Sequence, residues 1–535
     1  MWEFNKVSLT GRGYYLIVLI VAVGVALVAT ATNSWPTAVG YLLVAAAITL
    51  IFLRPTVGLW LLLVTLPFQR IYPVDLFIGR LTLPRTIVLV TMLALVIQNL
   101  IVRSDHGRFL RTPFNRPLLA LIVAWIASSF MSINIDPDTQ IQVFVLPSAS
   151  HLARYKPFLK SYTEIISYLV SVVALYIMSS LLRSTKLTFL AIKFWIMGAI
   201  IACLVGLYAT LGYYYNLPVP EEISNTYYLM DPGSFADVSR IKSITNEPRH
   251  FTYYLITILP FLIITGLYYK QYVVSRKFHL GALGLVGFSF WMTMSRSMVI
   301  LGIAMLVFLP ITAVMVRSKL SLQKLFGTLH RTVLLPIILL ALTAVLLFAI
   351  SGVNFSSAIL ALFETINPEQ GSTGPQLMNN IIAFSLFLES PVLGVGIGNF
   401  VFFATPLGIP NWVFSKYGVS DSPVHVTSLY LQTLSEVGIV GLVALLYLFV
   451  TIGRSTIHTI RMAIDERSNA IAVGLAGSFV MIALAAAFIP NFFNPETWVV
   501  LGFIAVMLRN VASGQQVVTM SQSETSAGAL QLPRP

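Results

Sequence analysis

Apolar runs about as long as a bilayer is thick recur along this chain, separated by short polar segments. A helix needs roughly 20 apolar residues to cross the hydrocarbon of a membrane. On this criterion we identify fourteen candidate spans, which begin near residues 14, 36, 56, 86, 117, 163, 187, 250, 280, 297, 332, 428, 470 and 497. The third and the last are short, so we expect 12 to 14 spans. The pattern predicts an all-α, polytopic integral membrane protein.

The composition agrees with this fold class. Of the 535 residues, 57% are hydrophobic and only 10% are charged, which is far from the composition of a soluble domain. The one cysteine, Cys203, lies in an apolar run, and this excludes a disulfide framework or a thiolate metal cluster. The first apolar run lacks a small-residue cleavage signal, so we expect it to be retained as a span.

Basic residues are concentrated in alternate loops between the spans. If the amino terminus is cytoplasmic, the short loops on that side are the basic segments 103–116, 183–186, 270–277, 317–331 and 454–467. Cytoplasmic loops of membrane proteins carry such an excess of Lys and Arg. We therefore expect both termini in the cytoplasm. The net charge of +13 follows from this topology and gives no reason to expect a nucleic-acid partner.

Three polar segments on the opposite side are long, at 134–162, 214–249 and 353–427. Loops of this length between spans are uncommon unless they carry function. We expect them to be structured extracytoplasmic loops of a single membrane domain at 1–512, and we expect a helix from Leu377 to Leu388 in the third. The tail at 513–535 is rich in Ser, Thr and Gln and is predicted to be a disordered cytoplasmic segment.

The stretch HVTSLYLQTLSEVGIVG at 425–441 places a histidine at the start of an apolar run and a glutamate within it. If a helix begins just after Pro423, His425 and Glu436 share one helical face. The other polar residues of that face are Ser428, Gln432 and Ser435. An acid inside a span needs a partner or a wet cavity, and function is its default interpretation. The alternative is an interfacial histidine with a structural acid bonded to another helix.

Several cations oppose the overall charge pattern, because they lie on the extracytoplasmic side. Arg240, Lys242 and Arg249 cluster beside Glu247 at the end of the second long loop. A guanidinium group is well suited to bidentate binding of phosphate oxygens. The alternatives are side chains that reach the lipid headgroups or pair with a nearby carboxylate.

Two further arginines share this unusual placement. Arg296 falls in a tight turn between two spans, and Arg85 ends the expected hairpin at 69–85, which also holds Arg70 and Arg80. Both would face the same side of the membrane as the cluster at 240–249. They are candidates for an anion site on that side.

Other short motifs do not indicate cofactor or metal chemistry. LGVGIGN at 393–399 follows no strand, so we interpret its glycines as a turn where backbone approaches backbone. The acids of the DPD motif at Asp136 and Asp138 are separated by proline and favour a solvated helix end over a metal site. We find no nucleotide-binding or zinc motif and no intramembrane acid and histidine series typical of a proton pump. No metal and no cofactor are expected.

Taken in order, these segments resemble the superfamily of O-antigen ligases and Wzy-type O-antigen or exopolysaccharide polymerases. The resemblance lies in TMSRSMVIL at 293–301, ESPVLGVGIGNF at 389–400 and the stretch at 425–441. ITNEPRHFTYYL at 244–255 is similar to the segment that precedes a span in many of the polymerases. An arginine that the family often has before the glycine-rich element is absent here, where the chain reads GPQLMNN.

The resemblance implies a GT-C-like fold and an inverting, metal-independent glycosyl transfer outside the cytoplasmic membrane. The donor would be a glycan on undecaprenyl pyrophosphate, and the acceptor a sugar hydroxyl. His425 would then supply the general base, and Arg249 and Arg296 would stabilise the departing pyrophosphate. The expected substrate-binding residues are Arg240, Lys242, Glu247, Arg85 and Glu436.

We predict a polymerase of lipid-linked repeat units in the bacterial inner membrane, with its active site facing the periplasm. Its partners would be the lipid-linked donor and acceptor, membrane lipids and a chain-length regulator protein. The nearest alternative is a ligase that transfers finished polymer to lipid A core. A third possibility is a secondary transporter or a carrier of lipid-linked sugars, although no pair of broken helices in corresponding halves supports it.

Overall fold

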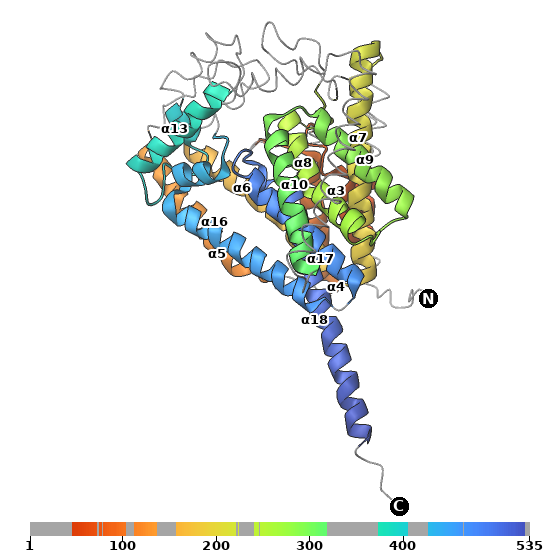
Figure 1. Ribbon diagram of the computed structural model, residues 1–535. Helices are drawn as coiled ribbons and strands as arrows, with labels where there is room; N and C mark the ends of the chain where they lie inside the picture. Colours follow the sequence, from red (N-terminus) through yellow and green to blue (C-terminus); the bar gives the residue numbers. More distant parts are fainter. Residues whose placement is uncertain are drawn as a thin grey trace, which may run out of the picture.

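The structure is a computed structural model, and it describes residues 45–71, 74–76, 79–102, 112–135, 157–220, 223, 240–245, 247–317, 373–404, 426–463 and 465–529. The described part is a bundle of long helices, with one long helix that projects from one end (Figure 1). Several spans and most of the long loops predicted from the sequence lie outside these residues, including those that begin near 14 and 332.

The helices coincide with the apolar runs of the sequence. The main ones are α3 (Pro55–Thr65), α4 (Leu83–Val102), α5 (Asn115–Ser129), α6 (Pro157–Leu181), α7 (Thr185–Tyr215), α8 (Pro248–Ile263), α9 (Arg276–Met292), α10 (Arg296–Arg317), α13 (Thr373–Glu389), α14 (Phe400–Ala404), α16 (Leu429–Met462), α17 (Glu466–Ala485) and α18 (Pro495–Ala529). The helix predicted from Leu377 to Leu388 is confirmed as the inner part of α13. Short 3-10 helices η2 (Phe130–Asn134) and η6 (Asn491–Phe493) and a π-helix, η5 (Ile264–Tyr268), adjoin them.

Eight helices in the described part are long and apolar enough to cross a membrane, and α3 and the segment Ser297–Leu309 are shorter apolar helices. The polytopic, helical fold class is therefore confirmed, whereas the number of fourteen spans stays a prediction. One small element departs from the all-α expectation. Strands β1 (Val74–Leu76) and β2 (Gly79–Leu81) form an antiparallel hairpin between α3 and α4.

Local chemistry fixes where several helices begin. Proline is the first residue of α3, α8 and α18, a position where its missing N–H costs nothing. Elsewhere a side chain accepts a hydrogen bond from the first turn, as Ser184 does from Leu187 N and Asp465 from Ser468 N. These caps lie in the short polar segments that separate the apolar runs.

Helices α8 and α17 form the centre of the bundle. Almost every residue of α8 is buried, and it packs against α9, α10 and α17. Helix α17 also contacts α16 and α18, and α18 packs along α6. On one side of the bundle α16 lies against α5 and α13. A core of large side chains, including Trp125, Trp195 and Trp498, fills the interior.

Helix α18 extends past the bundle, and its backbone is helical through Ala529 (Figure 1). The segment 513–529, which the composition predicts to be disordered, therefore continues the helix. No proline interrupts the chain between Pro495 and Pro533, and residues such as Gln and Met are compatible with a helix. The polar composition of 513–529 disfavours packing against the apolar bundle, but it does not by itself end a helix.

Helix α16 begins later than the sequence suggests. Ser428 is its N-cap, with extended backbone (φ −105°, ψ 124°), and its hydroxyl accepts from Leu431 N. Ser428 is held outside the helix because the N–H of the next residue, Leu429, donates to Ala486 O at the end of α17 (2.8 Å). The prediction of a helix that starts just after Pro423 is therefore wrong.

The glycine-rich turn predicted at 393–399 is confirmed, and the backbone that it approaches is that of α16. Helix α16 is kinked at Gly438, whose φ of 72° and ψ of −167° are accessible essentially to glycine alone. Across the kink, Val395 N donates to Ser435 O (2.9 Å) and Ile439 N donates to Pro391 O (2.9 Å). At Gly394 a Cβ would lie 2.4 Å from the carbonyl carbon of Glu436.

This junction predicts the effect of adding a methyl group at Gly438. A Cβ there would lie 2.2 Å from the oxygen of Val392, and the backbone conformation alone would cost roughly 1–3 kcal/mol. We expect Gly438→Ala to lower the melting temperature of the purified protein by several degrees in lipid nanodiscs. Gly453→Ala, in the same helix with no atom within 4 Å of its Cβ, is the matched control and should be neutral. Equal melting temperatures for the two variants would contradict this account of the kink.

Candidate active site

Most of the buried acids and several cations and amides of the described interior lie at one end of the bundle. Helices α8, α10, α16 and α18 begin at this end, and α9 and α17 finish there. Two hydrogen bonds between distant segments join these helix ends, from Arg70 N to Ile244 O (3.0 Å) and from Ile241 N to Met292 O (3.0 Å). We call this region the polar end.

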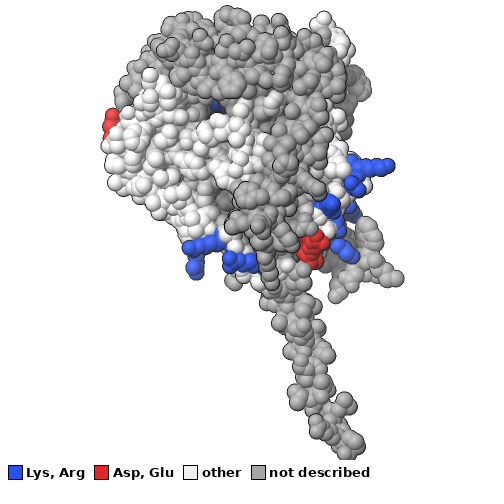
Figure 2. Space-filling view, in the orientation of Figure 1, with Lys and Arg blue, Asp and Glu red and all other residues white. Residues whose placement is uncertain are grey.

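The opposite end has a different charge pattern. Exposed basic residues lie there in or near the ends of helices, including Arg183, Lys186, Arg276, Lys277 and Arg454. Figure 2 shows Lys and Arg side chains gathered at the end of the molecule from which α18 projects. The two ends of the described bundle thus differ in that one is basic and exposed, while the other holds buried charges of both signs.

The first part of the polar end is a cationic segment at 240–249. Arg240 Nε donates to Thr293 O at 3.1 Å, in the turn between α9 and α10. The hydroxyls of Thr252 and Ser295 lie 2.8 Å apart, so α8 is joined to the same turn. The segment at 240–252 and the start of α10 therefore form one unit, although forty or more residues separate them in the sequence.

Glu247 and Arg249 flank Pro248 at the start of α8. The Nε of Arg249 lies 2.5 Å from a carboxylate oxygen of Glu247, and both side chains are largely buried. The sequence left open whether these arginines pair with a nearby carboxylate, and Arg249 does so. The ion pair orients the guanidinium group.

Lys242 is the most buried cation of the segment, with 2% of its surface exposed. Burial, together with the nearby guanidinium group of Arg70, lowers the pKa of the ammonium group from 10.5 to about 8. No carboxylate in the described part of the chain forms an ion pair with it. A buried cation beside a second cation is stabilised by an anion, so this position favours a negatively charged ligand.

Arg85 lies in the first turn of α4 and connects the cationic segment to the rest of the polar end. Its Nη2 donates to Asn494 Oδ1 at 3.3 Å, just before α18. It is also within electrostatic reach of Glu164 and Glu496. The arginine that the sequence placed in an extracytoplasmic hairpin is therefore set among acids from two other helices.

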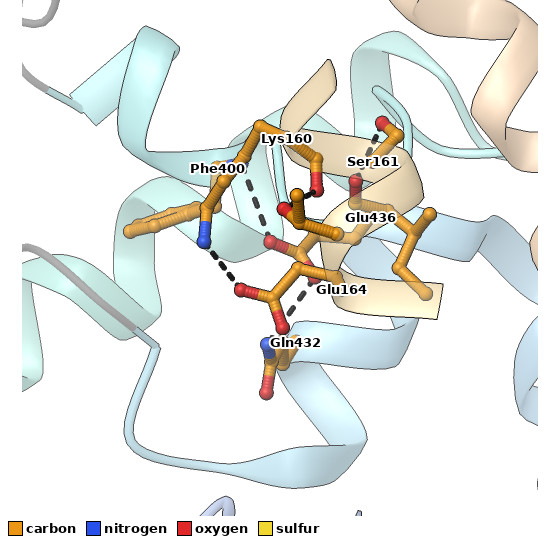
Figure 3. Close-up of polar contacts among 8 residues, drawn as sticks. Lys160, Ser161, Glu164, Phe400, Gln432 and Glu436 are labelled. Carbon is orange, nitrogen blue, oxygen red and sulfur yellow. Dashed lines mark hydrogen bonds and ion pairs between the residues drawn. The ribbon is translucent and has the colours of Figure 1, made fainter. Parts of the chain in front are cut away.

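The second part of the polar end surrounds Glu436 of α16 (Figure 3). One carboxylate oxygen accepts from Phe400 N at 3.3 Å, and the other accepts from Gln432 Nε2 at 3.2 Å. Its backbone oxygen accepts from Ser128 Oγ of α5 and from Gly396 N. Glu436 thus holds the glycine-rich turn by side chain and main chain together, which corresponds to the structural alternative for this acid.

Two residues of α6 that the sequence analysis did not select lie beside Glu436. Glu164 forms an ion pair with Lys160 one turn earlier and is within electrostatic reach of Glu436. Ser161, the residue after Lys160, donates from its Oγ to Ile397 O of the glycine-rich turn at 2.7 Å. Glu164 is an acid in an apolar run and follows a lysine by four residues, a spacing at which opposite charges stabilise a helix. This pattern could have identified the pair from the sequence.

A further acid, Glu496, was also missed. It lies in the first turn of α18 and is fully buried. One of its oxygens accepts from Gln69 Nε2 at 3.0 Å, the residue next to Arg70. It is the last residue of the NPE motif at 494–496, just before an apolar run. Acids are common at such a helix start, so the sequence alone did not separate Glu496 from a capping residue.

The structure thus places six of the eight residues selected from the sequence, namely Arg85, Arg240, Lys242, Glu247, Arg249 and Glu436, at the polar end. Arg296 is the first residue of α10, in the turn that Arg240 contacts, and its side chain lies outside the described residues. His425 also lies outside them. The residues that follow it are fixed, since Thr427 Oγ1 donates to Asn380 Oδ1 of α13 at 3.1 Å and Val426 is buried.

No group of three or more His, Cys, Asp or Glu side chains in the described residues is arranged to hold a metal ion. The acids at the polar end are instead bonded to amides, backbone N–H groups and cations.

The low pKa of Lys242 predicts a stability effect that depends on pH. The folded-state pKa is below the unfolded value, so the charged lysine destabilises the fold fully below about pH 8, and this penalty disappears as the pH rises towards 10.5. We expect Lys242→Met to raise the melting temperature at pH 7 and to lose that advantage by pH 10.5. Lys277→Met, at an exposed position, is the control and should show no such pH dependence. If the difference in melting temperature between Lys242→Met and the wild type did not change with pH, the lowered pKa of Lys242 would be contradicted.

Comparison with known proteins identifies part of the chain. Residues 274–446, about a third of the sequence, match the family model described as O-antigen ligase. This region runs from the start of α9 to the middle of α16 and includes the turn before α10, the glycine-rich turn and Glu436. No curated protein sequence matches the chain significantly. The resemblance seen in the motifs at 293–301, 389–400 and 425–441 is thereby confirmed: residues 274–446 of this polytopic helical protein match the O-antigen ligase family.

Proposed function

We propose that this protein is a polymerase that joins lipid-linked oligosaccharide repeat units, with a polyprenyl diphosphate as the leaving group. The observation that carries the proposal is that the cationic segment 240–249 meets the start of α10 at one end of a membrane bundle, with the buried Lys242 beside Arg70. A membrane-embedded anion site of this kind suits a lipid diphosphate headgroup.

In the proposed reaction, a sugar hydroxyl of one repeat unit attacks the anomeric carbon of another. The new C–O bond forms as the bond to the diphosphate oxygen breaks, and the lipid diphosphate leaves with the electron pair. The anomeric configuration inverts, because attack and departure occur on opposite faces. His425 takes the proton of the attacking hydroxyl, for which a neutral imidazole is suited near pH 7.

The cations would act on the leaving group. Arg249 and Arg296 would contact the diphosphate, whose negative charge increases as the bond breaks, and preorganised donors stabilise that charge most strongly where water is excluded. Arg240, Lys242 and Glu247 would shape the adjoining pocket. Anion binding would restore the charged form of Lys242, whose pKa is about 8 in the free protein, so the site is best occupied below that pH.

Glu436 and Arg85 would complete the site from the side of α16 and α4. Through Phe400 and Gln432, Glu436 fixes the glycine-rich turn, and this gives it a positioning role next to the substrate. Arg85 would contribute positive charge between the acids of α6 and α18. Neither assignment requires a metal ion.

The charge distribution supports a topology for this reaction. Exposed basic connections favour the cytoplasmic side, which is the end from which α18 projects (Figure 2). The polar end would then face the outside of the cytoplasmic membrane, where lipid-linked repeat units are polymerised in this superfamily. A chain-length regulator would be a partner at the same face.

Removing the proposed base gives the most direct test. We expect His425→Ala to be inserted and folded but to form no polymer ladder when it replaces the natural protein in cells, because the attacking hydroxyl keeps its proton. His458→Ala, at the opposite end of α16, is the control and should leave the ladder intact. A normal ladder from His425→Ala would exclude the base assignment.

The choice between polymerase and ligase is tested by the glycan that accumulates in a deletion strain. We expect single repeat units on lipid A core, because a ligase in the same cell still transfers the unpolymerised unit. Full-length chains retained on the carrier lipid would identify the protein as the ligase instead. The segment at 244–255 and the long loops at 134–162 and 214–249 favour the polymerase.

A further inference from the structure

Helix α13 presents an apolar face to its surroundings, although it lies in a segment that the sequence predicts to be an extracytoplasmic loop. Between residues 377 and 388, large apolar side chains are 40% to 63% exposed, namely those of Leu377, Met378, Ile381, Phe384 and Leu388. Their spacing is that of one helical face. The exposed polar residue among them, Ser385, donates from its hydroxyl to Ile381 O at 3.1 Å. This face of α13 therefore offers no side-chain group that needs water.

The opposite face of α13 is also largely apolar. It packs into a small core made of Ile382, Ala383, Leu386, Val395, Phe400 and Val426. No Lys, Arg, Asp or Glu occurs from Thr373 to Leu388, and the single charge of the helix is its last residue, Glu389. A helix that lies between a packed core and water normally has a polar outer face, so water is a poor match for the outward face of α13.

The outward face of α13 adjoins the exposed side of α16. The turn that follows α13 bonds to this helix, since Val440 N donates to Val392 O at 3.4 Å. Val392, Ile439 and Val440 are 59%, 43% and 41% exposed. The last two belong to the candidate span Leu429–Met462, whose exposed side chains also include Val443, Leu446 and Val450. In Figure 2 the surface over α13 and the adjoining part of α16 is almost entirely white. The face thus continues a surface that the bilayer covers.

The length and the charge of α13 limit how deep it can lie. With 17 residues, it is shorter than the roughly 20 residues that a span needs. The side chain of Glu389 is exposed at the end of the helix, and a carboxylate in the hydrocarbon core would be costly. At the level of the headgroups this carboxylate stays hydrated, while the apolar face of a helix in the membrane plane reaches the acyl chains.

We propose that α13 is an interfacial membrane helix, whose outward face inserts among the acyl chains of the leaflet at the polar end. Hydrophobic contact holds it there, since α13 carries no Lys or Arg for anionic headgroups. The glycine-rich turn follows α13 directly and bonds to α16 around Glu436. Insertion of α13 would therefore fix the depth of the turn and of Glu436 in the membrane. The inference rests on the exposed side chains and does not depend on the reaction proposed above.

Fluorescence from a single labelled cysteine tests the proposal with the full-length protein in nanodiscs. Cys203 is the only cysteine of the chain, so Cys203→Ala provides a background in which Ile381→Cys supplies the single thiol. The label is the fluorophore NBD, whose emission shifts to the blue in an apolar environment. Two further variants give the limits, namely Val443→Cys on the exposed side of α16 for lipid and Lys277→Cys at the exposed start of α9 for water.

We expect the label at position 381 to behave like that at position 443. Its emission should be shifted to the blue, lipids with a spin label on the acyl chain should quench it, and the quenching by iodide that is seen at position 277 should be lost. A melting temperature equal to that of Cys203→Ala shows that a variant is folded. Should Ile381→Cys fail to fold, Phe384→Cys on the same face is measured in the same way.

Iodide quenching as strong at position 381 as at position 277 would place α13 in water and overturn the proposal. A label that neither the spin-labelled lipids nor iodide quench would overturn it as well. In that case protein covers the face, either another segment of this chain or a second copy. The proposed function is tested separately by the polymer ladder, so either conclusion can fail without the other.

Discussion

Contact between two stretches of backbone, the glycine-rich turn and the kink of α16, is the constraint on which the polar end depends. At Gly394 and Gly438 the chains approach so closely that neither position has room for a Cβ, and four hydrogen bonds join the turn to residues 435–440. The same bonds use the N–H and C=O groups that the kink removes from the helix, and in a membrane interior these groups need partners. The turn therefore makes the kink possible, and the kink fixes the turn.

This junction also sets the positions of the acids. Glu436 lies just before the kink, and its carboxylate binds Phe400 N at the end of the turn. From α6, Ser161 holds the other side of the turn and brings Glu164 close to Glu436. Charged groups in a membrane bundle are tolerated where they are paired and bonded in this way. The polar end is thus a connected network and not a collection of separate charges.

Most cations and most acids of the polar end come from different elements of the bundle. Most of the cations come from 240–249, from Arg70 and from the first turn of α4, whereas Glu164, Glu436 and Glu496 come from α6, α16 and α18. Glycosyl transfer to a hydroxyl needs both kinds of site, since the leaving group is an anion and the acceptor is a neutral sugar.

The sequence by itself determined the fold class, because a bilayer leaves helices as the way for long apolar runs to satisfy their backbone, and it identified the cations through their unusual charge placement. It also predicted the turn at 393–399, since repeated glycines indicate close backbone approach. Only the tertiary structure decided where α16 begins, because Ser428 is held outside the helix by a contact with the end of α17. It alone selected Glu164 and Glu496, because their surroundings come from distant parts of the chain. Ser161, one turn before Glu164, bonds Ile397, which is 236 residues away, and Gln69 bonds Glu496, which is 427 residues away. Hydropathy and short motifs report on local chain segments, and such distant pairings leave no mark in either.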